Sequence, residues 1–425
     1  MGLTLFISFA FLVLLSIPIS ISLGFASVIA LLLYGQGSTI IVIQKLFGGA
    51  NSFILMAIPF FILAGNIMSA GGVSRRLVNL ADTILGRAIG GLAIVATVSC
   101  TFFGAISGSA IATTTAIGSI MIEPMQKMGY SKDFSSATIA ASGTIGLLIP
   151  PSITMVLYGV IADVSIAKLF LGGVIPGLLM CMGLVFVEYI ISKRRGYRGR
   201  AVAGGANSIV QAFKQSILAL LMPVIILGGI YGGIFTPTEA AVVAVVYGLF
   251  IGGFVYRELR LKDLQQIIMK TVKSVAVVIY LVATARIFSH LLVIEEMPQK
   301  FGQFLIGISS SSTMVLFLIC VCLLIVGTFL NNSVAVVLMT PIFYPIISQL
   351  GIDPVFFGVL MVLALAIGNV TPPVGLCLFA ACEIADISIE RISKAVIPHI
   401  IVLIFVLLII LLLPKLVLLI PNSMM

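Results

Sequence analysis

Ile149-Pro150-Pro151 lies inside a long apolar run, and Thr371-Pro372-Pro373 occupies the corresponding place 222 residues later. The flanks repeat as well, since residues 162–166 (ADVSI) correspond to residues 385–389 (ADISI). A Pro-Pro pair removes two backbone donors and clashes with the preceding turn, so a helix must break at each pair. In lipid, a broken helix is tolerated only where protein buries it or where it lines a wet cavity. Broken helices at matching positions of two halves indicate a transporter's binding site.

The composition places the chain in a membrane. Hydrophobic residues make up 61% of the 425 residues and charged residues only 9%, and residues 395–414 are long enough to cross a bilayer. The net charge of +9 does not indicate nucleic-acid binding, because no basic patch is interleaved with aromatic residues. The basic loop 193–200 instead predicts a cytoplasmic position for that loop. We therefore expect a polytopic all-α membrane protein.

The chain divides into two similar halves. Each half has three apolar spans, an amphipathic stretch, a pair of apolar arms, a broken helix and a last span. The second arm of each pair has about 14 residues, against the roughly 20 needed to cross a bilayer, so the pairs are expected to be re-entrant hairpins. Five true spans per half then remain, and an odd number predicts inverted repeats. The expected segments are a first repeat at 1–195 (hairpin 91–124, broken helix 133–162), a basic cytoplasmic linker at 196–208, and a second repeat at 209–425 (hairpin 304–347, broken helix 355–384).

The hairpin tips and helix breaks are the candidate binding sites. Free carbonyl and hydroxyl oxygens suit Na⁺, and half-helix N-termini present N–H groups to an anion. We therefore expect one sodium site at each tip and neighbouring break, and a substrate carboxylate between them. The candidate sodium-binding residues are Gly104, Ser107, Gly108, Ser109, Gly146, Ile149, Pro150, Gly327, Asn331, Asn332, Ser333, Gly368, Val370 and Thr371. The candidate substrate-binding residues are Ser109, Pro151, Ser152, Arg286, Asn332, Thr371 and Pro372.

Some of these residues have a second interpretation. Arg286 lies in an apolar run without an acid, where an ionisable residue marks a functional site by default and can hold a carboxylate with two hydrogen bonds. It can equally snorkel or bind helix-end carbonyls. Small residues at the tips can simply let helices pack closely. Thr236 and Glu239 are expected to form a capping box, and Asp163 and Asp386 are expected to begin helices.

The motifs together resemble the large membrane subunit of the tripartite ATP-independent periplasmic (TRAP) transporters. The matching stretches are 57–65 (AIPFFILAG), 107–110 (SGSA), 129–130 (GY), 149–152 (IPPS), 236–240 (TPTEA) and 371–375 (TPPVG). The resemblance implies an elevator-type, Na⁺-coupled importer of organic acids in the bacterial inner membrane, with no cofactor besides Na⁺. It also implies a periplasmic binding protein and a separate small four-helix membrane subunit as partners. The family often has an acidic residue where this chain has Asn331. The asparagine still offers an oxygen, but it carries no charge.

Several functions stay open at this point. Family substrates include C4-dicarboxylates, sialic acids and 2-oxo acids, and overall likeness favours the sialic acid branch. The alternative transporter is a stand-alone Na⁺/dicarboxylate symporter that needs no binding protein. A passive channel is disfavoured because no polar stripe follows several helices, and an intramembrane enzyme because paired catalytic residues are absent. Without a Walker motif, ATP is not expected to be the energy source.

Overall fold

The fold was obtained as a computed structural model that describes residues 1–34, 39–199, 206–309 and 311–424, and these ranges contain helices and no strand. The helices of the first half are α1 (Gly2–Leu14), α2 (Ile19–Tyr34), α3 (Thr39–Ala50), η1 (Ile54–Met56), α4 (Ala57–Ala70), α5 (Val73–Leu85), α6 (Gly91–Ser107), α7 (Ala110–Lys127), α8 (Lys132–Gly143), η2 (Thr144–Leu147), α9 (Ile153–Ala162) and α10 (Ile166–Arg195). Those of the second half are α11 (Ala206–Tyr231), α12 (Pro237–Phe250), η3 (Ile251–Val255), α13 (Leu261–Ile294), α14 (Met297–Ile308), α15 (Ser312–Phe329), α16 (Asn332–Gln349), α17 (Pro354–Gly368), α18 (Leu376–Ala385), α19 (Ile389–Leu412) and α20 (Lys415–Met424).

The order of elements repeats between the halves. Among the described residues, seven helices are long and apolar enough to cross a membrane, or eight if the bent pair α3 and α4 counts as one span. α1–α10 correspond one by one to α11–α19, except that the single long helix α13 stands opposite α3 and α4, which meet at 55°. Glycine, asparagine and serine at residues 48–52 are poor helix formers and account for that bend. The expected all-helical membrane fold is confirmed.

Some element boundaries differ from the expectation. The amphipathic helix α14 continues to Ile308, so the first arm of the second hairpin begins at Ser312 instead of residue 304. Helix α11 begins at Ala206, inside the segment expected to be a linker, and residues 200–205 of that segment lie outside the described residues. Both breaks fall where the Pro-Pro pairs predict them, because η2 ends at Leu147 and α17 ends at Gly368.

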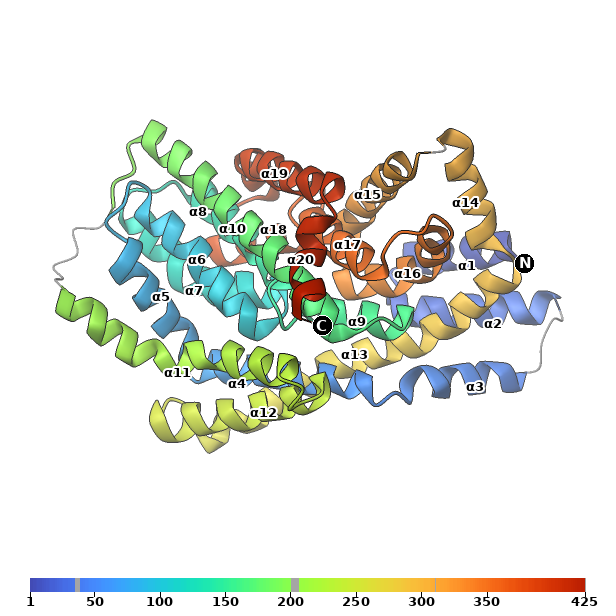
Figure 1. The fold of residues 1–425 in the computed structure, drawn as a ribbon, viewed down its shortest axis with the longest axis horizontal. Coiled ribbons are helices and arrows are strands. Elements are labelled where there is room, and N and C mark those ends of the chain that lie inside the picture. The colour runs from blue at the N-terminus through green and yellow to red at the C-terminus, as the bar shows by residue number, and fades with distance from the viewer. Residues whose placement is uncertain (35–38, 200–205, 310, 425) are drawn as a thin grey trace.

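Figure 1 shows how the two halves interlock. Helices α3, α4, α12 and α13 form an elongated lower layer, with α6–α8 above it on one side and α15–α17 on the other. Within the layer, α4 packs against α12 and α13 packs against α2 and α3. The second part of each broken helix packs against the hairpin of the opposite half: α9 against α16, and α18 against α7. This exchange brings both hairpins and both breaks into one region.

Two predictions about helix ends have different outcomes. The capping box of α12 is confirmed, because Thr236 accepts from the Glu239 backbone N–H and the Glu239 carboxylate accepts from the Thr236 N–H at 2.8 Å. The prediction that Asp163 and Asp386 begin helices is wrong. Both residues end helices, α9 and α18, in the left-handed conformation, with φ of 56° and 52°. Aspartate tolerates this conformation, which lets the chain turn before the next helix.

Candidate functional site

The first hairpin tip lies directly on the first helix break. A Cβ added to Gly104 of α6 would lie 2.6 Å from the Gly146 Cα in η2, far inside van der Waals contact. A Cβ on Gly108, where φ is +60°, would lie 2.6 Å from the Pro151 carbonyl oxygen. Only glycine permits such close backbone approach together with this positive φ. The structure therefore brings four of the predicted residues into contact.

A chain of hydrogen bonds orders the inside of this first tip. The Ser107 and Thr113 hydroxyls are 2.8 Å apart, and Thr113 Oγ1 donates to the Ser109 carbonyl at 2.8 Å. In a continued helix, the carbonyls of Gly146 and Leu147 would accept hydrogen bonds from the nitrogens of Pro150 and Pro151. A proline nitrogen carries no hydrogen, so these two bonds cannot form. Among the described residues, no backbone donor reaches either carbonyl. The first break therefore presents open carbonyl oxygens beside a cluster of hydroxyls.

The second tip and break repeat the close glycine contact. A Cβ on Gly368 would lie 2.6 Å from the Gly327 Cα. Two carbonyls of this break are already used, since Thr371 N–H donates to the Gly368 oxygen at 2.9 Å and Cys377 N–H donates to the Asn369 oxygen at 3.1 Å. The Thr371 hydroxyl turns back to its own helix and donates to the Ile367 oxygen at 2.8 Å. The second break thus offers fewer open oxygens than the first.

Three asparagines supply the polar groups of the second side. Asn331 caps α16, because its Oδ1 accepts from the Ser333 N–H at 3.0 Å. Asn332 and Asn369 are 4% and 2% exposed. Within the described part of the chain, both side-chain polar atoms of Asn332 and the Oδ1 of Asn369 have no hydrogen-bond partner. Buried amides normally find partners, so these two are open to a ligand.

Both tips and both breaks line one small cavity of about 40 Å³. Its lining residues are Gly108, Ser109, Ala110, Ile111, Leu147, Ile153, Thr154, Asn331, Asn332, Ser333 and Asn369. The first turns of three helices contribute: Ala110 begins α7, Ile153 begins α9 and Asn332 begins α16. Helix N-termini carry a partial positive charge and free N–H groups, so the cavity favours an anion without holding a charged side chain of its own.

The predicted site residues divide into three groups: those that line the cavity, those that support the tips and breaks, and Arg286, which lies in a different cavity. Gly108, Ser109, Asn331, Asn332 and Ser333 line the cavity. A second group supports the tips and breaks from behind: Gly104, Ser107, Gly146, Ile149, Pro150, Pro151, Ser152, Gly327, Gly368, Val370, Thr371 and Pro372. Ser152, for example, caps α9 by accepting from the Met155 N–H at 3.3 Å. The sequence analysis did not identify Asn369, Thr154 and Thr113 as site residues. Asn369 could have been found, because it is the one polar residue between Gly368 and Thr371.

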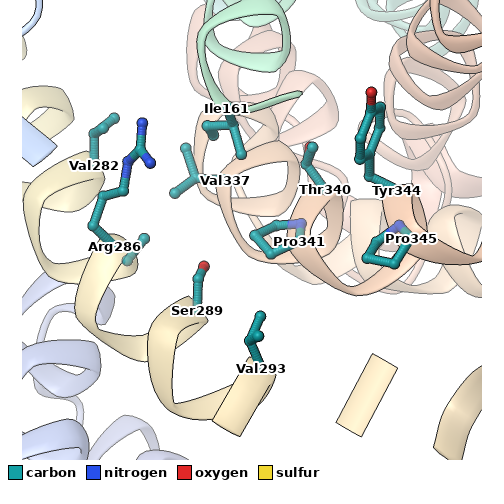
Figure 2. Close-up of a pocket in the computed structure, with 11 residues that line it drawn as sticks. Ile161, Val282, Arg286, Ser289, Val293, Val337, Thr340, Pro341, Tyr344 and Pro345 are labelled. Atoms are coloured by element: carbon teal, nitrogen blue, oxygen red, sulfur yellow. The ribbon is translucent and has the colours of Figure 1, made fainter. Parts of the chain in front are cut away.

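Arg286 lies in a different cavity. This second cavity, of about 210 Å³, separates α13 from α16 and the end of α9. In Figure 2 the guanidinium of Arg286 points into the gap, beside Val282 and opposite Val337 and Ile161. Among the described residues it has no ion-pair partner. Thr340, also on the cavity wall, is eight residues from Asn332 along α16, which is about 12 Å at 1.5 Å per residue.

No group of three or more histidine, cysteine, aspartate or glutamate residues gathers as a metal site in the described ranges. The fold and its interrupted helices define the class of a secondary membrane transporter. Residues 6–416 match the family model described as tripartite ATP-independent periplasmic transporter, DctM component. The chain belongs to this family, and it is a large TRAP permease of the bacterial inner membrane.

Relatives of named function agree with this assignment. The chain is 46% identical to an isethionate TRAP transporter permease protein of Oleidesulfovibrio alaskensis over 95% of this chain, but it spans only 64% of that relative's length. It is 38% identical to a C4-dicarboxylate TRAP large permease of Pseudomonas aeruginosa, over 94% of each chain. It is also 38% identical to a sialic acid TRAP large permease of Vibrio cholerae, over 95% of each chain. The YdaH transporter of Alcanivorax borkumensis shares the fold, with a TM-score of 0.67 at 14% identity, covering 88% of this chain and 87% of that one.

Proposed function

We propose that this chain is the substrate-translocating subunit of a sodium-coupled importer of small organic anions. The observation that carries the proposal is the convergence of both tips and both breaks on one polar cavity without a charged side chain. A transporter site built from interrupted helices binds cations on open carbonyls and anions on half-helix N-termini. Each Na⁺ that enters down a 100 mV potential contributes roughly 2.3 kcal/mol, so two ions can drive uptake of an anion.

The first side of the cavity is the better cation site. The carbonyls of Gly146 and Leu147 lie beside the ordered hydroxyls of Ser107 and Thr113, and all four groups offer neutral oxygens. On the second side, the carbonyl oxygens are taken by the chain itself and Asn331 brings no charge. We therefore assign the stronger sodium site to the first tip and break, and a weaker one to the second.

The second side is the better anion site. The unpartnered amide of Asn332 can donate N–H groups to a carboxylate or a sulfonate, and Asn369 adds an unpartnered Oδ1, which can accept a hydrogen bond from a hydroxyl of the substrate. An acid at position 331 would repel such a substrate, whereas Asn331 does not. The cavity of about 40 Å³ holds about three waters at roughly 10–15 Å³ each, so an organic acid requires the tips to move apart.

Arg286 suggests how the tips move. We propose that the hairpins and broken helices slide as one body along α13, as in an elevator. A displacement of about 12 Å along α16 would bring Asn332 to the level now held by Thr340, beside Arg286. The guanidinium would then face the substrate anion in one of the two end states.

The substrate is proposed only as a class. The isethionate relative is 46% identical to this chain, whereas the C4-dicarboxylate relatives are 37–40% identical and the sialic acid relatives 37–38% identical. Sequence identity therefore does not favour sialic acid, the expected substrate, over the other acids. A sulfonate or a carboxylate could each accept the N–H groups of Asn332 on the second side of the cavity.

We further propose that a periplasmic binding protein delivers the anion and that a small membrane subunit completes the transporter. The family description, "tripartite", supports both partners. The competing candidate is a stand-alone symporter with the same fold, which would need no binding protein.

The test is uptake in proteoliposomes that contain this chain and the small subunit encoded beside it. Labelled isethionate, succinate and sialic acid are each supplied with and without the cognate binding protein, and with and without an inward Na⁺ gradient. Uptake of one acid that needs both the protein and the gradient supports the proposal. Uptake without the binding protein favours the stand-alone symporter, and uptake that ignores Na⁺ refutes the coupling.

A further inference from the structure

A carboxyl group lies buried in the first half, away from the tip cavity. Glu188 of α10 is 0% exposed, and it lies between α6 and α8. Its Oε1 accepts hydrogen bonds from the hydroxyls of Thr97 and Ser142, the second at 3.5 Å. Its Oε2 has no hydrogen-bond partner among the described residues. The mechanism proposed above makes no use of this group.

The surroundings of Glu188 are neutral. The groups that interact with it electrostatically are the thiols of Cys100 on α6 and Cys181 on its own helix. Of the other elements packed against α10, α17 and η2 carry no titratable side chain. The remaining elements carry the titratable residues Lys132 and Asp133 (α8), Tyr158 (α9), Glu390, Arg391, Lys394 and His399 (α19) and Lys415 (α20). Asp133 is paired with Arg391. None of the salt bridges found among the described residues involves Glu188. A buried carboxylate without a cation is strongly disfavoured, so the group is stable only as a neutral acid or with a bound cation.

The polar groups beside this carboxyl do not form a metal site. The Thr97 and Ser142 hydroxyls are 2.6 Å apart, and in the described ranges no group of three or more histidine, cysteine, aspartate or glutamate residues gathers around the carboxyl. A proton needs no such coordination shell. The residue one helical turn further along, Ser192, is also 0% exposed, and its hydroxyl has no partner in the described structure. It lies next to Lys193, at the start of the basic stretch expected on the cytoplasmic side.

Polar groups also lead from Glu188 towards the first tip. Ser142 precedes Gly143, where an added Cβ would meet the Thr114 hydroxyl at 2.0 Å. Thr114 Oγ1 is buried and unpartnered in the described residues, and its neighbour Thr113 belongs to the hydroxyl cluster of the tip. The carboxyl thus lies close to the proposed sodium site, and the contact of Gly143 with Thr114 separates the two groups.

We propose that Glu188 of α10 is a proton-binding site held against the first hairpin and the first broken helix, and that its proton is released to the cytoplasmic side past Ser192 during uptake. The carboxyl Oε2–H bond breaks on release, the carboxylate forms, and the proton passes to cytoplasmic water; a proton from the opposite side restores the acid in the return. The proton thereby travels with the anion, and Na⁺ remains the main driving ion.

The first experiment measures the proton itself and does not depend on transport. Infrared spectra of the purified chain in lipid are compared for wild type, Glu188→Gln and the control Glu123→Gln, which removes an exposed carboxyl paired with Lys127. We expect a protonated-carboxyl band at neutral pH in the wild type and in Glu123→Gln, and its loss in Glu188→Gln. Glutamine has the shape of the neutral acid, so this variant is expected to fold. Equal bands in wild type and Glu188→Gln would overturn the proposal.

The second experiment, which rests on the proposed function, follows proton movement in the same vesicles as uptake. A pH dye inside the proteoliposomes records acidification while labelled substrate enters down a Na⁺ gradient. We expect acidification with uptake in the wild type and at least a tenfold loss of acidification per substrate in Glu188→Gln. Uptake without acidification in the wild type overturns the proton site and leaves the importer standing. No uptake with any acid refutes the importer, and the infrared band then decides on the proton site alone.

Discussion

The two tip-and-break units use the same backbone and different side chains. In both, a glycine of the hairpin touches a glycine of the broken helix, Gly104 with Gly146 and Gly327 with Gly368. The first unit adds hydroxyls and leaves break carbonyls without a backbone donor in the described structure. The second unit satisfies its carbonyls and adds unpartnered amides. The repeat therefore fixes the backbone contact of each unit, while a few side chains give the two units different polar groups.

The largest effect is expected from placing a methyl group between tip and break. In Gly104→Ala and Gly368→Ala the new Cβ would lie 2.6 Å from backbone atoms of the facing segment, which cannot yield as a side chain can. We expect each variant to lose more than tenfold in uptake, with a stability cost of about 1–3 kcal/mol or more from overpacking. Gly228→Ala is the matched control, because an added Cβ there meets nothing within 4 Å. Normal uptake by both tip variants would show that the contact is not needed.

The next effect separates substrate binding from stability on the second side. Asn332→Leu and Asn369→Leu remove amides that have no partner in the described structure, so thermal stability should stay equal or rise. Substrate affinity should fall by about 10- to 100-fold, the range for a lost hydrogen bond to a charged group. Binding is measured by substrate-dependent shifts in melting temperature. A drop in stability without a change in affinity would assign both residues a purely structural role.

A smaller effect is expected on the first side. Thr113→Val keeps the shape of the side chain and removes the hydroxyl that links Ser107 to the Ser109 carbonyl. We expect the Na⁺ concentration for half-maximal uptake to rise about tenfold, while the substrate dependence at saturating Na⁺ changes little. Thr115→Val is the control, because the Thr115 hydroxyl only bonds the Ile111 carbonyl of its own helix. The same shift in both variants would contradict the assignment of the cation site to the first tip.

The smallest effect tests the charge difference directly. Asn331→Asp restores an acid at the second tip, and aspartate caps a helix as well as asparagine, so stability should change by less than about 0.5 kcal/mol. We expect Na⁺ affinity to improve a few-fold and anion affinity to weaken a few-fold. Both are read from uptake curves at varied Na⁺ and varied substrate. Improvement of both affinities would show that the acid does not face the anion.

The sequence indicated much of this site because its strongest signals are local. A Pro-Pro pair breaks a helix in any context, and its repetition located both breaks to within a few residues. Glycine and serine at 104–109 and at 327–333 likewise indicated the tips. Asn369 and Thr113 were missed because their roles depend on contacts between segments. Asn369 lines the cavity, and the Thr113 hydroxyl links the Ser107 hydroxyl to the Ser109 carbonyl.

Composition, repeat and helix breaks identified an all-helical membrane protein with two interrupted-helix units, because backbone donors and apolar length are properties of the chain alone. Only the tertiary structure decided which groups meet. It paired α9 with α16 and α18 with α7, so that both units share one cavity. It also placed Arg286 in a separate cavity and buried Glu188 among neutral groups. These outcomes depend on packing between segments far apart in the sequence, such as Glu188 with Ser142 and Thr97, 46 and 91 positions away, and no local pattern records such contacts.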